Sequence, residues 1–398
     1  MELIQLQKEF ETELADNILD FWINKVYDPE RRTFFGKVSN LNKPFPEEPH
    51  SAVLLTRVLW TFSAAYHSFS KEEEYKKLAD EAYRILMENF WDNNNGGIFW
   101  CVSPDGSPAD TKKQFYAQAF FIYALSEYYR AFKNETAKQL AVSMFMLLEK
   151  YGGDPQFGGY VEAKTAEWKE LQDQRLSSKD MNTRKSMNTH LHVLEAYTNL
   201  YRIWKDDTLK QKLENLLGIF TNKIINRKTG HFQLFFDEDW SFRGEIDSYG
   251  HDIEGSWLLT EAAGVLGNKT LISELELISI QMAETTIKEG LGENGGLFYE
   301  KENGILKPEF HWWPQAEAVI GFFNAWQISG GKKYFELVLK NWNFIQKYII
   351  DHKNGDWFWG ISKSYDLLSD EKVNAWKAPY HNGRMCMEMI RRLKNSSK

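Results

Sequence analysis

GGIFWCV, residues 96–102, is a glycine-flanked aromatic segment that comes shortly before a long apolar stretch, KQFYAQAFFIYAL, at residues 113–125. Five similar aromatic segments occur along the chain: 33–38 (TFFGKV), 157–161 (FGGYV), 230–236 (GHFQLFF), 295–300 (GGLFYE) and 355–361 (GDWFWGI). Glycines beside short aromatic runs indicate β-hairpins. A period of roughly 60 to 70 residues predicts a repeat architecture, in which each copy is one supersecondary unit.

Two kinds of helical segment alternate between these hairpins. One kind is charged with a narrow apolar stripe, which is typical of helices with one face in water: 6–25, 71–91, 135–151, 208–225, 270–289 and 332–348. The other kind is apolar nearly all round and is expected to be buried: 51–69, 113–132, 186–204, 249–266, 311–328 and 381–393. This alternation predicts an all-α fold, an (α/α)6 barrel with six inner and six outer helices.

The order outer helix, hairpin, inner helix places every hairpin at one end of the barrel. The N-termini of the inner helices, with unpaired N–H groups and positive dipole ends, lie at that end and suit oxygen-rich or anionic intermediates. An open solenoid is the alternative, but it needs polar capping repeats, whereas the last inner segment contains MCMEMI at 385–390. We expect a closed barrel, one domain over residues 1–398, with its pocket and its short β-hairpins at the same end.

Composition and charge argue against several classes of protein. The net charge is −8 and the basic residues are scattered, which argues against nucleic acid as a partner. With only Cys101 and Cys386 a disulfide scaffold is excluded, and a reducing cytoplasm is the expected compartment. There is neither a secretory signal pattern nor an apolar run of about 18 residues that could span a membrane. We expect a cytoplasmic monomer or weak dimer.

Unusual polar or aromatic residues stand at or near the starts of the apolar helices. In chain order they are Arg57, Tyr116, His192, His251, Trp313 with Glu317, and His381. Because all inner helices begin at the same end, we expect one active site assembled from six repeats. The 15 tryptophans of the chain also suit platforms for sugar rings, although most are expected to be core anchors.

His251 begins a possible acid/base group in SYGHDIEGSW, residues 248–257. On a helix His251 and Glu254 share a face, so the carboxylate can orient the imidazole and raise its basicity. Trp257 lies nearer to that face than to the opposite one. The alternative interpretation is a buried ion pair.

Three further regions bring histidine or arginine to the same end. His190 and His192 point about 200° apart on a helix, so one packs and the other faces the pocket, and spacing does not say which. His381 lies in a constrained turn, WKAPYHNGR at 376–384. Arg57 is costly in an apolar stretch unless it pairs with an acid such as Glu317 or binds a substrate oxygen.

Metal binding and glycoside hydrolysis are alternative chemistries. HExxH and paired-cysteine motifs are absent from the sequence, and His-x-His spacing is poor on a helix, so we predict no metal. Hydrolysis needs two carboxylates across the glycosidic bond, for which Glu254 and Glu317 are available. Histidines facing each other better suit the movement of a carbon-bound proton near neutral pH.

The most distinctive segments are KQFYAQAF, KSMNTHLHVLEAYTNLYR, SYGHDIEGSWLL, HWWPQAEAVIGFFNAWQ and WKAPYHNGR. They closely resemble the N-acylglucosamine 2-epimerase superfamily, and within it the branch that acts on cellobiose. The resemblance covers essentially the whole chain and implies an (α/α)6 barrel that needs no cofactor. It also implies inversion of C2 in the reducing-end glucose of β-1,4-linked disaccharides, from cellobiose to glucosyl-mannose and from lactose to epilactose.

The resemblance further implies roles for individual residues. His251 and His381 correspond to the acid/base pair, and His192 to a third histidine of the pocket. The implied contacts to the sugar are Arg57, Tyr116, Asn188, Glu254 and Glu317, with Trp313 and Trp376 stacking on sugar rings and Trp257 as a further binding residue. In RLSSKD, residues 175–180, Ser177 and Asp180 correspond to a loop that holds the non-reducing sugar.

One position departs from the family pattern. Asp247 precedes SYGHD where cellobiose-specific members carry an apolar residue, and an acid there can contact a sugar hydroxyl and favour monosaccharides. The connection 240–251 has ordinary length, whereas mannose-specific relatives have a longer covering loop, which favours a disaccharide. A monosaccharide-specific mannose/glucose 2-epimerase and an N-acylglucosamine 2-epimerase remain alternatives.

Overall fold

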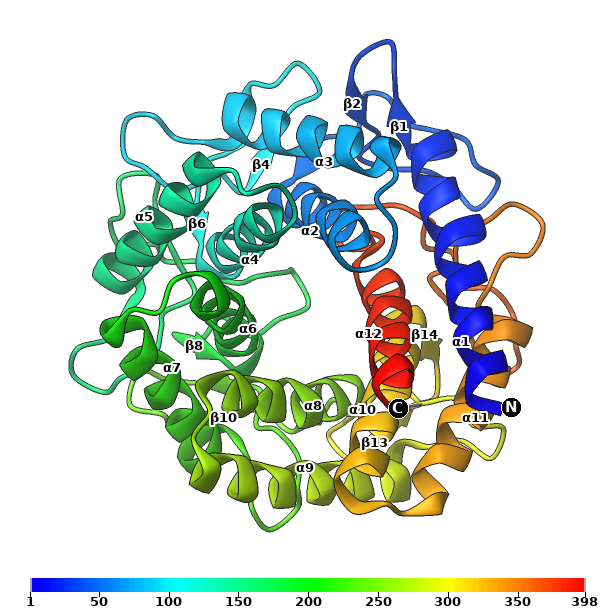
Figure 1. Cartoon of the computed structure of the whole chain (residues 1–398). Coiled ribbons are helices and arrows are strands. Elements are labelled where there is room, and N and C mark those ends of the chain that lie inside the picture. The colour runs from blue at the N-terminus through cyan, green and yellow to red at the C-terminus, as the bar shows by residue number, and fades with distance from the viewer. Residues whose placement is uncertain (1, 397–398) are drawn as a thin grey trace.

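The computed structural model describes residues 2–396 as two concentric rings of helices (Figure 1). Within these residues the inner ring has six helices: α2 (Ala52–Ser68), α4 (Phe115–Phe132), α6 (Met187–Ile203), α8 (Tyr249–Leu266), α10 (Trp312–Ser329) and α12 (Tyr380–Ser396). The outer ring has α1 (Glu2–Thr12), α3 (Glu73–Ile85), α5 (Glu135–Gly152), α7 (Asp207–Ile219), α9 (Lys269–Gly290) and α11 (Lys332–Tyr348). The predicted (α/α)6 barrel is confirmed.

The ring closes between its first and last repeats. Helix α12 packs against both α2 and α10, and α1 lies beside α12 (Figure 1). An antiparallel bridge between Val38 and Val373 joins the segments that lead into α2 and α12. The helices therefore form a closed barrel rather than an open solenoid.

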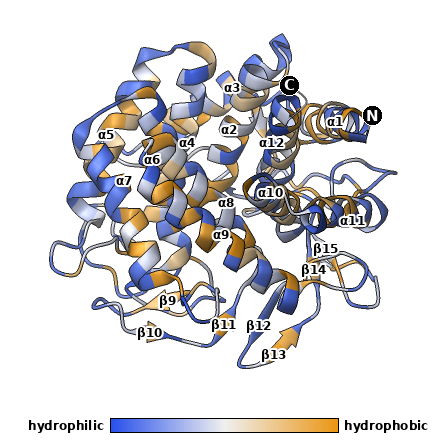
Figure 2. Ribbon diagram, turned by 60° about the horizontal axis from the view of Figure 1, so that its bottom comes forward, coloured by the Kyte–Doolittle hydropathy of each residue, from blue (hydrophilic) through white to orange (hydrophobic). Residues whose placement is uncertain are grey.

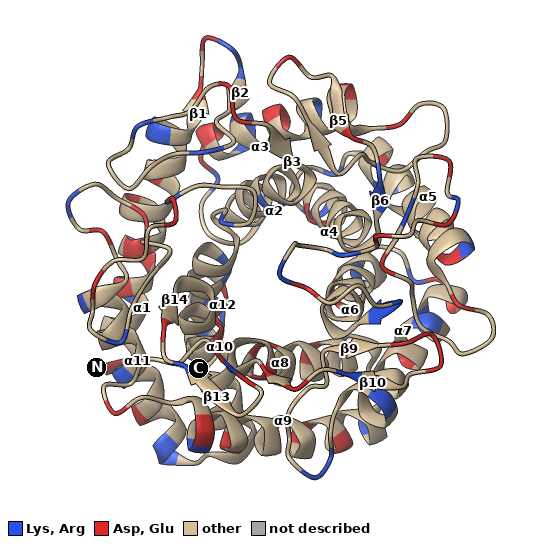
Figure 3. Ribbon diagram, turned by 180° about the vertical axis from the view of Figure 1, so that it is seen from behind, with Lys and Arg blue, Asp and Glu red and all other residues tan. Residues whose placement is uncertain are grey.

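Burial separates the two rings as the sequence pattern predicts. In α4 every residue from Phe115 to Tyr128 is buried, whereas the buried residues of α7 are Leu209, Leu213, Leu216 and Leu217, on one helix face. Charged residues of both signs lie mainly on the outer helices and loops (Figure 3). Each large apolar side chain buried in the inner ring contributes about 1.5–3 kcal/mol to folding. None of the described helices is long and apolar enough to cross a membrane.

Three outer helices end in π-helical turns that the sequence does not reveal. These turns are η1 (Glu13–Leu19) and η2 (Trp22–Val26) after α1, η3 (Leu86–Phe90) after α3 and η4 (Phe220–Ile224) after α7. A π turn accommodates one extra residue and so rotates the side chains that follow. Phe90 and Phe220 are fully buried in these turns.

Strand pairing links neighbouring repeats, which differs from the self-contained hairpins expected from the sequence. The aromatic segments close on themselves mostly through single bridges, such as Trp91 with Ile98, or through β1 (Tyr27–Asp28) with β2 (Thr33–Phe34). The antiparallel pairs between repeats are β3 (His50–Ser51) with β4 (Cys101–Val102), β6 (Lys113–Gln114) with β7 (Ala163–Lys164), β8 (Lys185–Ser186) with β9 (Phe235–Phe236), β11 (Ile246–Asp247) with β12 (Glu300–Glu302) and β14 (Phe310–His311) with β15 (Gly360–Ile361). Further strands are β5 (Pro108–Asp110), β10 (Phe242–Arg243) and β13 (Ile305–Lys307), which extend these sheets. Strands β9 to β15 gather at one end of the barrel, beside the N-termini of the inner helices (Figure 2).

Buried ion pairs anchor the hairpin turns to the segments that enter the inner helices. Lys113 Nζ lies 2.9 Å from Asp92 Oδ2, and Asp92 Oδ1 accepts the backbone N–H groups of the turn residues Asn94 and Asn95. The same ion pair recurs as Lys185 with Asp154 and as Lys372 with Asp351, both at 2.7 Å. Because each ammonium is buried with its carboxylate, the loss of one partner would leave an unpaired buried charge. These pairs hold the hairpin end of the barrel in place.

Candidate active site

Three histidines lie near the N-termini of inner helices, and a neighbour holds Nδ1 of each ring. The contacts are to Glu195 Oε2 for His192 (3.0 Å), Glu317 Oε1 for His381 (2.7 Å) and Ser248 Oγ for His251 (2.7 Å). Nε2 of these rings has no hydrogen-bond partner among residues 2–396. Where a carboxylate accepts the Nδ1 proton, Nε2 of the neutral ring carries the lone pair and can act as a base.

Burial keeps these histidines neutral. It lowers the pKa of His251 to about 3 and also lowers that of His192. The pKa of His381 is lowered well below its usual value, first by burial and then by the positive charge of Arg57. All three rings are therefore neutral at pH 7, the protonation state that a general base requires.

The ambiguity between His190 and His192 is resolved by their hydrogen bonds. His190 Nδ1 donates to the carbonyl of Ser186 at 2.7 Å, and its Nε2 accepts the backbone N–H of Tyr160 at 2.9 Å. Both ring nitrogens are thus used by the fold. His192 packs instead against Tyr116, with ring centroids 4.7 Å apart, and keeps Nε2 free.

Glu254 does not orient His251, which corrects the pairing expected from their spacing. Glu254 Oε1 accepts a hydrogen bond from Arg384 Nη2 at 2.7 Å, whereas the ring of His251 is held by Ser248. A guanidinium competes better for a buried carboxylate than a neutral imidazole does. The same three-residue spacing does produce a contact between His192 and Glu195.

Arg384 lies at the centre of a buried network that the sequence analysis missed. Its Nη2 donates to Glu254 and Glu317, each at 2.7 Å, and its Nη1 contacts Glu195 and the hydroxyl of Tyr380. Three of these residues follow a histidine by three positions, as Glu195, Glu254 and Arg384 follow His192, His251 and His381. The network is therefore one helical turn deeper than the histidines. A charged residue in the apolar turn after His381 was the signal available in the sequence.

The network holds three carboxylates around one guanidinium, and this imbalance shifts their pKa values. Burial raises the pKa of Glu195, but Arg384 and His192 outweigh it and bring the value to about 2. For Glu254, burial and the neighbouring Glu317 raise the pKa to about 8. Burial also raises the pKa of Glu317. Glu317 accepts hydrogen bonds at both oxygens, from His381 and Arg384 at Oε1 and from Trp257 at Oε2, whereas among residues 2–396 Glu254 accepts one, at Oε1. The proton that burial favours at neutral pH is therefore assigned to Glu254, and Glu195 and Glu317 are the carboxylates that hold the two histidines.

Trp257 supports this network rather than lining the mouth of the barrel. It is 1% exposed, its Nε1 donates to Glu317 Oε2 at 3.0 Å, and its ring lies 4.8 Å from the Arg384 guanidinium. Trp257 follows His251 by six residues, which places it about 9 Å further along the helix axis. The expected contact between Trp257 and substrate is therefore replaced by a contact with Glu317.

Arg57 makes no ion pair with any described residue, so of the two alternatives for this side chain the pairing with an acid such as Glu317 does not form. Its Nη1 donates to the carbonyl of Trp376 at 2.6 Å and its Nη2 to the hydroxyl of Tyr116 at 2.9 Å. The Nε atom is buried and has no partner. Burial raises the pKa of Tyr116 to about 12, so this hydroxyl stays protonated and neutral. A buried cation without a carboxylate is costly, and an oxygen-rich or anionic ligand would compensate it.

Trp313 lies against two of the histidines. Its ring centroid is 4.7 Å from that of His251 and 5.7 Å from that of His381. Gly250 permits this approach, because a Cβ atom at that position would lie 2.5 Å from Trp313 Cη2. Trp376, from the segment before α12, is half-buried, and its ring centroid lies 6.1 Å from that of Tyr116.

A groove of about 500 Å³ opens beside His251 at the hairpin end. Its lining includes Asn188, whose Oδ1 is buried without a partner, and Asp180. Ser177 donates its backbone N–H to Asp180 Oδ2 at 2.8 Å within the loop between β7 and β8, which extends over the central opening (Figures 1 and 3). Burial raises the pKa of Asp180. The groove thus continues from the histidines to the loop expected to hold a second sugar.

Asp247 points away from this groove, which overturns the expected contact with a sugar hydroxyl. Its neighbours Ile246 and Ser248 line the groove, whereas Asp247 forms an ion pair with Lys301 at 2.8 Å. Side chains alternate between the two faces of a strand, and Asp247 belongs to the face opposite Ile246. The departure from the family pattern therefore gives no reason to expect a monosaccharide.

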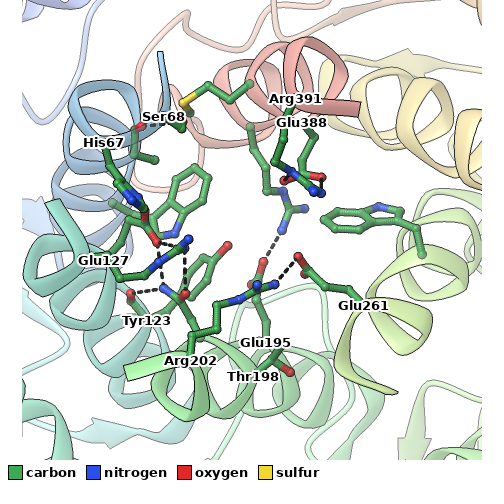
Figure 4. A pocket seen from close by; sticks show the side chains of 17 residues that line it. His67, Ser68, Tyr123, Glu127, Glu195, Thr198, Arg202, Glu261, Glu388 and Arg391 are labelled. Atoms are coloured by element: carbon green, nitrogen blue, oxygen red, sulfur yellow. Dashed lines mark hydrogen bonds and ion pairs between the residues drawn. The ribbon is translucent and has the colours of Figure 1, made fainter. Parts of the chain in front are cut away.

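A second, smaller cavity of about 120 Å³ lies at the opposite end of the barrel, among the C-terminal halves of inner helices (Figure 4). Figure 4 shows Glu195 at this cavity together with Arg202 and Glu261, which form an ion pair at 2.7 Å. Arg384 and Trp257 also line it. The buried network therefore separates the histidines from the far end of the barrel.

Two groups of side chains have the composition of a metal site, but a protein cation lies within each. Glu254, Glu317 and His381 bring ligand atoms within 4.8 Å of one another, with Arg384 bonded to both carboxylates. The second group is His231, Asp247 and Glu289, with Lys301 bonded to both carboxylates at 2.8 and 2.9 Å.

Comparison with known proteins identifies the family of this chain. The family model for N-acylglucosamine 2-epimerase (GlcNAc 2-epimerase) matches residues 33–384. The chain belongs to this family. It is 45% identical over 388 residues to a cellobiose 2-epimerase of Bacteroides fragilis, covering 97% of this chain and 98% of that protein. A cellobiose 2-epimerase of Dictyoglomus turgidum is 37% identical over 394 residues, covering 99% and 100%.

A solved structure supports the same assignment. The cellobiose 2-epimerase from Bacillus thermoamylovorans superimposes with a TM-score of 0.93 at 37% identity, covering 98% of this chain and 99% of that chain. The chain is thus a carbohydrate 2-epimerase, an isomerase homologous to cellobiose 2-epimerases. The family resemblance of the sequence motifs is confirmed.

Proposed function

We propose that this epimerase inverts C2 of the reducing-end glucose in β-1,4-linked disaccharides, converting cellobiose to glucosyl-mannose and lactose to epilactose. The observation that carries the proposal is the pair His251 and His381, two neutral imidazoles that contact the same Trp313 ring. Inversion of a C–H centre needs a base on one face and an acid on the other. Two histidines beside one aromatic platform meet that requirement.

The reaction begins with opening of the reducing-end ring, in which His381 serves as acid and base. The aldehyde that forms acidifies the hydrogen on C2, and His251 Nε2 removes it to give a cis-enediolate. Arg57 stabilises the negative charge of this intermediate, as does His192 once the anion draws a proton onto its Nε2. The negative charge of the enediolate lets His381 take up a proton from solvent at Nε2, and the imidazolium protonates C2 on the opposite face to yield a mannose unit. His251 releases the proton that it took from C2 to solvent. Each base contributes on the order of a hundred- to ten-thousandfold to the rate.

The remaining side chains hold the sugar. Asn188 Oδ1 and Arg57 Nε are buried without partners, and sugar hydroxyls or the enediolate would satisfy them. The further proposed hydrogen-bonding contacts are Tyr116, Glu254 and Glu317, of which Glu317 acts mainly through His381. Trp313 and Trp376 stack on the sugar rings.

A disaccharide is favoured over a monosaccharide by the groove beside His251. Its volume of about 500 Å³ is within the range of small-molecule sites. Asp180, on the loop between β7 and β8, lines the groove, and Ser177 donates its backbone N–H to Asp180 Oδ2. We propose that these two residues hold the non-reducing sugar. Asp180→Asn should therefore raise KM for cellobiose and leave the turnover of glucose unchanged.

Glycoside hydrolysis is the competing chemistry, and the carboxylates do not favour it. Glu254 and Glu317 both bind Nη2 of Arg384, and each is at most 1% exposed. Hydrolysis needs the two carboxyl groups on either side of a bound glycosidic bond. Here a guanidinium fills the space between them.

Product analysis after incubation with cellobiose tests the proposal. We expect glucosyl-mannose as the product and no free glucose, and lactose should give epilactose. His251→Ala and His381→Ala should still bind disaccharide but lose turnover. Release of glucose, or turnover near that of the unchanged protein in either histidine variant, would contradict the assignment.

A further inference from the structure

Three inner helices have a serine at the residue before their first turn, and one of these serines behaves differently. Ser51 Oγ accepts the backbone N–H of Leu54 at 3.0 Å, and Ser186 Oγ accepts that of Thr189 at 3.1 Å. Both side chains therefore cap their helices in the usual way. Ser248 occupies the same position before α8 but makes no capping hydrogen bond with its side chain.

The hydroxyl of Ser248 is used by His251 instead. Ser248 Oγ lies 2.7 Å from His251 Nδ1, and the serine is 2% exposed, so water does not compete for this contact. A serine cap is worth about 1 kcal/mol to a helix. The first turn of α8 lacks that stabilisation, because the hydroxyl of Ser248 contacts His251 instead. The contact with His251 therefore serves a purpose other than helix stability.

The partner of His251 also differs in charge from the partners of the other two histidines. His192 and His381 are held by Glu195 and Glu317, whereas His251 is held by a neutral hydroxyl. A carboxylate can only accept the Nδ1 proton, and a serine hydroxyl can accept it as well, which leaves the lone pair on Nε2. A carboxylate at this place would add a negative charge beside an anionic intermediate, and a hydroxyl does not.

We infer that Ser248 is a positioning residue, which holds His251 in the orientation and tautomer that place a neutral, unprotonated Nε2 toward C2. The inference rests on the proposed function, because it concerns the base of that reaction. Without the hydroxyl, the buried Nδ1–H has no acceptor, and the neutral ring exchanges between its two tautomers and can rotate. Only one tautomer removes the C2 proton.

The test compares Ser248→Ala with Ser51→Ala, using cellobiose as substrate. Ser51→Ala removes the hydrogen bond that caps α2 and a second one to the carbonyl of Ala375. The melting temperature of this variant should therefore fall by about 1–3 °C, with kcat unchanged. Ser248→Ala should lower kcat by about ten- to hundredfold with KM within about twofold, because orientation rather than binding is lost. Ser248→Thr, which keeps a hydroxyl, should recover most of the turnover, and Ser248→Cys should not.

The outcomes separate this inference from the proposed function. A Ser248→Ala variant that keeps kcat within about twofold of the unchanged protein overturns the inference alone. A rise of KM in Ser248→Ala with kcat unchanged also overturns the inference, since it would indicate that Ser248 contributes to substrate binding. If Ser248→Ala does not fold, equal turnover in Ser248→Thr and Ser248→Cys overturns it. Failure of the unchanged protein to epimerise cellobiose overturns the proposed function itself.

Discussion

Glu317 Oε1 lies 2.7 Å from His381 Nδ1 and accepts a second hydrogen bond of 2.7 Å from Arg384 Nη2. One carboxylate oxygen thus joins a proposed catalytic base to the buried cation at the centre of the barrel. The carboxylate fixes the tautomer of His381 and stabilises the imidazolium that forms when the ring takes up a proton. Arg384 in turn holds the carboxylate in place.

Replacement of this carboxylate should therefore affect turnover more than binding. We expect Glu317→Gln to lower kcat about ten- to hundredfold, because an amide gives the imidazolium no compensating charge. Steady-state kinetics with cellobiose measures this effect. Glu261→Gln is the matched control, since Glu261 pairs with Arg202 at the far end of the barrel and should leave kcat unchanged. Equal kcat in Glu317→Gln and the unchanged protein would show that His381 does not depend on this contact.

Arg384 is predicted to be essential for folding as well as for the site. Arg384→Met leaves the buried carboxylates of Glu195 and Glu317 without a cation, which should lower the free energy of unfolding by about 3–5 kcal/mol. Arg202→Met is the control, because its ion pair with Glu261 is partly exposed and contributes less than about 1 kcal/mol. Denaturant unfolding of both variants measures the difference. Similar losses in the two variants would argue against a central role for Arg384.

The pH dependence of turnover should follow the shifted pKa values. Burial lowers the pKa of His251 to about 3, so the neutral base persists as pH falls through 6.5, where an exposed histidine is protonated. We expect kcat/KM to change less than about twofold between pH 7 and about pH 5.5, whereas an ordinary histidine base would lose about tenfold. Above about pH 8 Glu254 loses its proton and adds a negative charge near the enediolate, so kcat should fall as pH rises. An acid limb near pH 6.5 would contradict this assignment.

Gly250 provides a test of the place of Trp313. A Cβ at Gly250 would lie 2.5 Å from Trp313 Cη2, so Gly250→Ala must displace the indole from His251 and His381. We expect at least about a tenfold loss of kcat/KM for cellobiose. Gly264→Ala is the control, because nothing lies within 4 Å of a Cβ there and alanine favours the helix. Unchanged kinetics in Gly250→Ala would show that Trp313 need not occupy this position.

Much of the fold follows from the sequence, because burial has a periodic signature. Nearly continuous apolar residues in 113–132 predict an inner helix, and the leucine spacing of 208–225 predicts an outer one. The pairing of strands between repeats has no such signature, since two-residue strands are too short to show alternation. The π turns at Leu86–Phe90 and Phe220–Ile224 are likewise set by packing and not by a local pattern.

The candidate site is also only partly predictable, because the sequence indicates some of its residues but not their hydrogen-bond partners. Position near the start of an inner helix is enough to single out His251 and His381, but it does not decide between His190 and His192. The partners of these rings are less predictable, because three-residue spacing is present in both His192/Glu195 and His251/Glu254 but only the first pair forms. The difference is made by Arg384, which reaches Glu254 from another helix, a contact that no local spacing encodes. The outward direction of Asp247 follows from the alternation of side chains along a strand. It can be predicted only when Ile246–Asp247 is already known to be a strand.

The central claim is that His251 and His381 exchange the proton at C2 of a reducing sugar. Nuclear magnetic resonance of cellobiose incubated with the protein in heavy water measures this directly. The account predicts deuterium at C2 of the reducing-end unit, together with conversion of glucose to mannose configuration, and neither change with His251→Ala. Conversion without deuterium at C2, or no exchange at C2 of cellobiose at all, would contradict it.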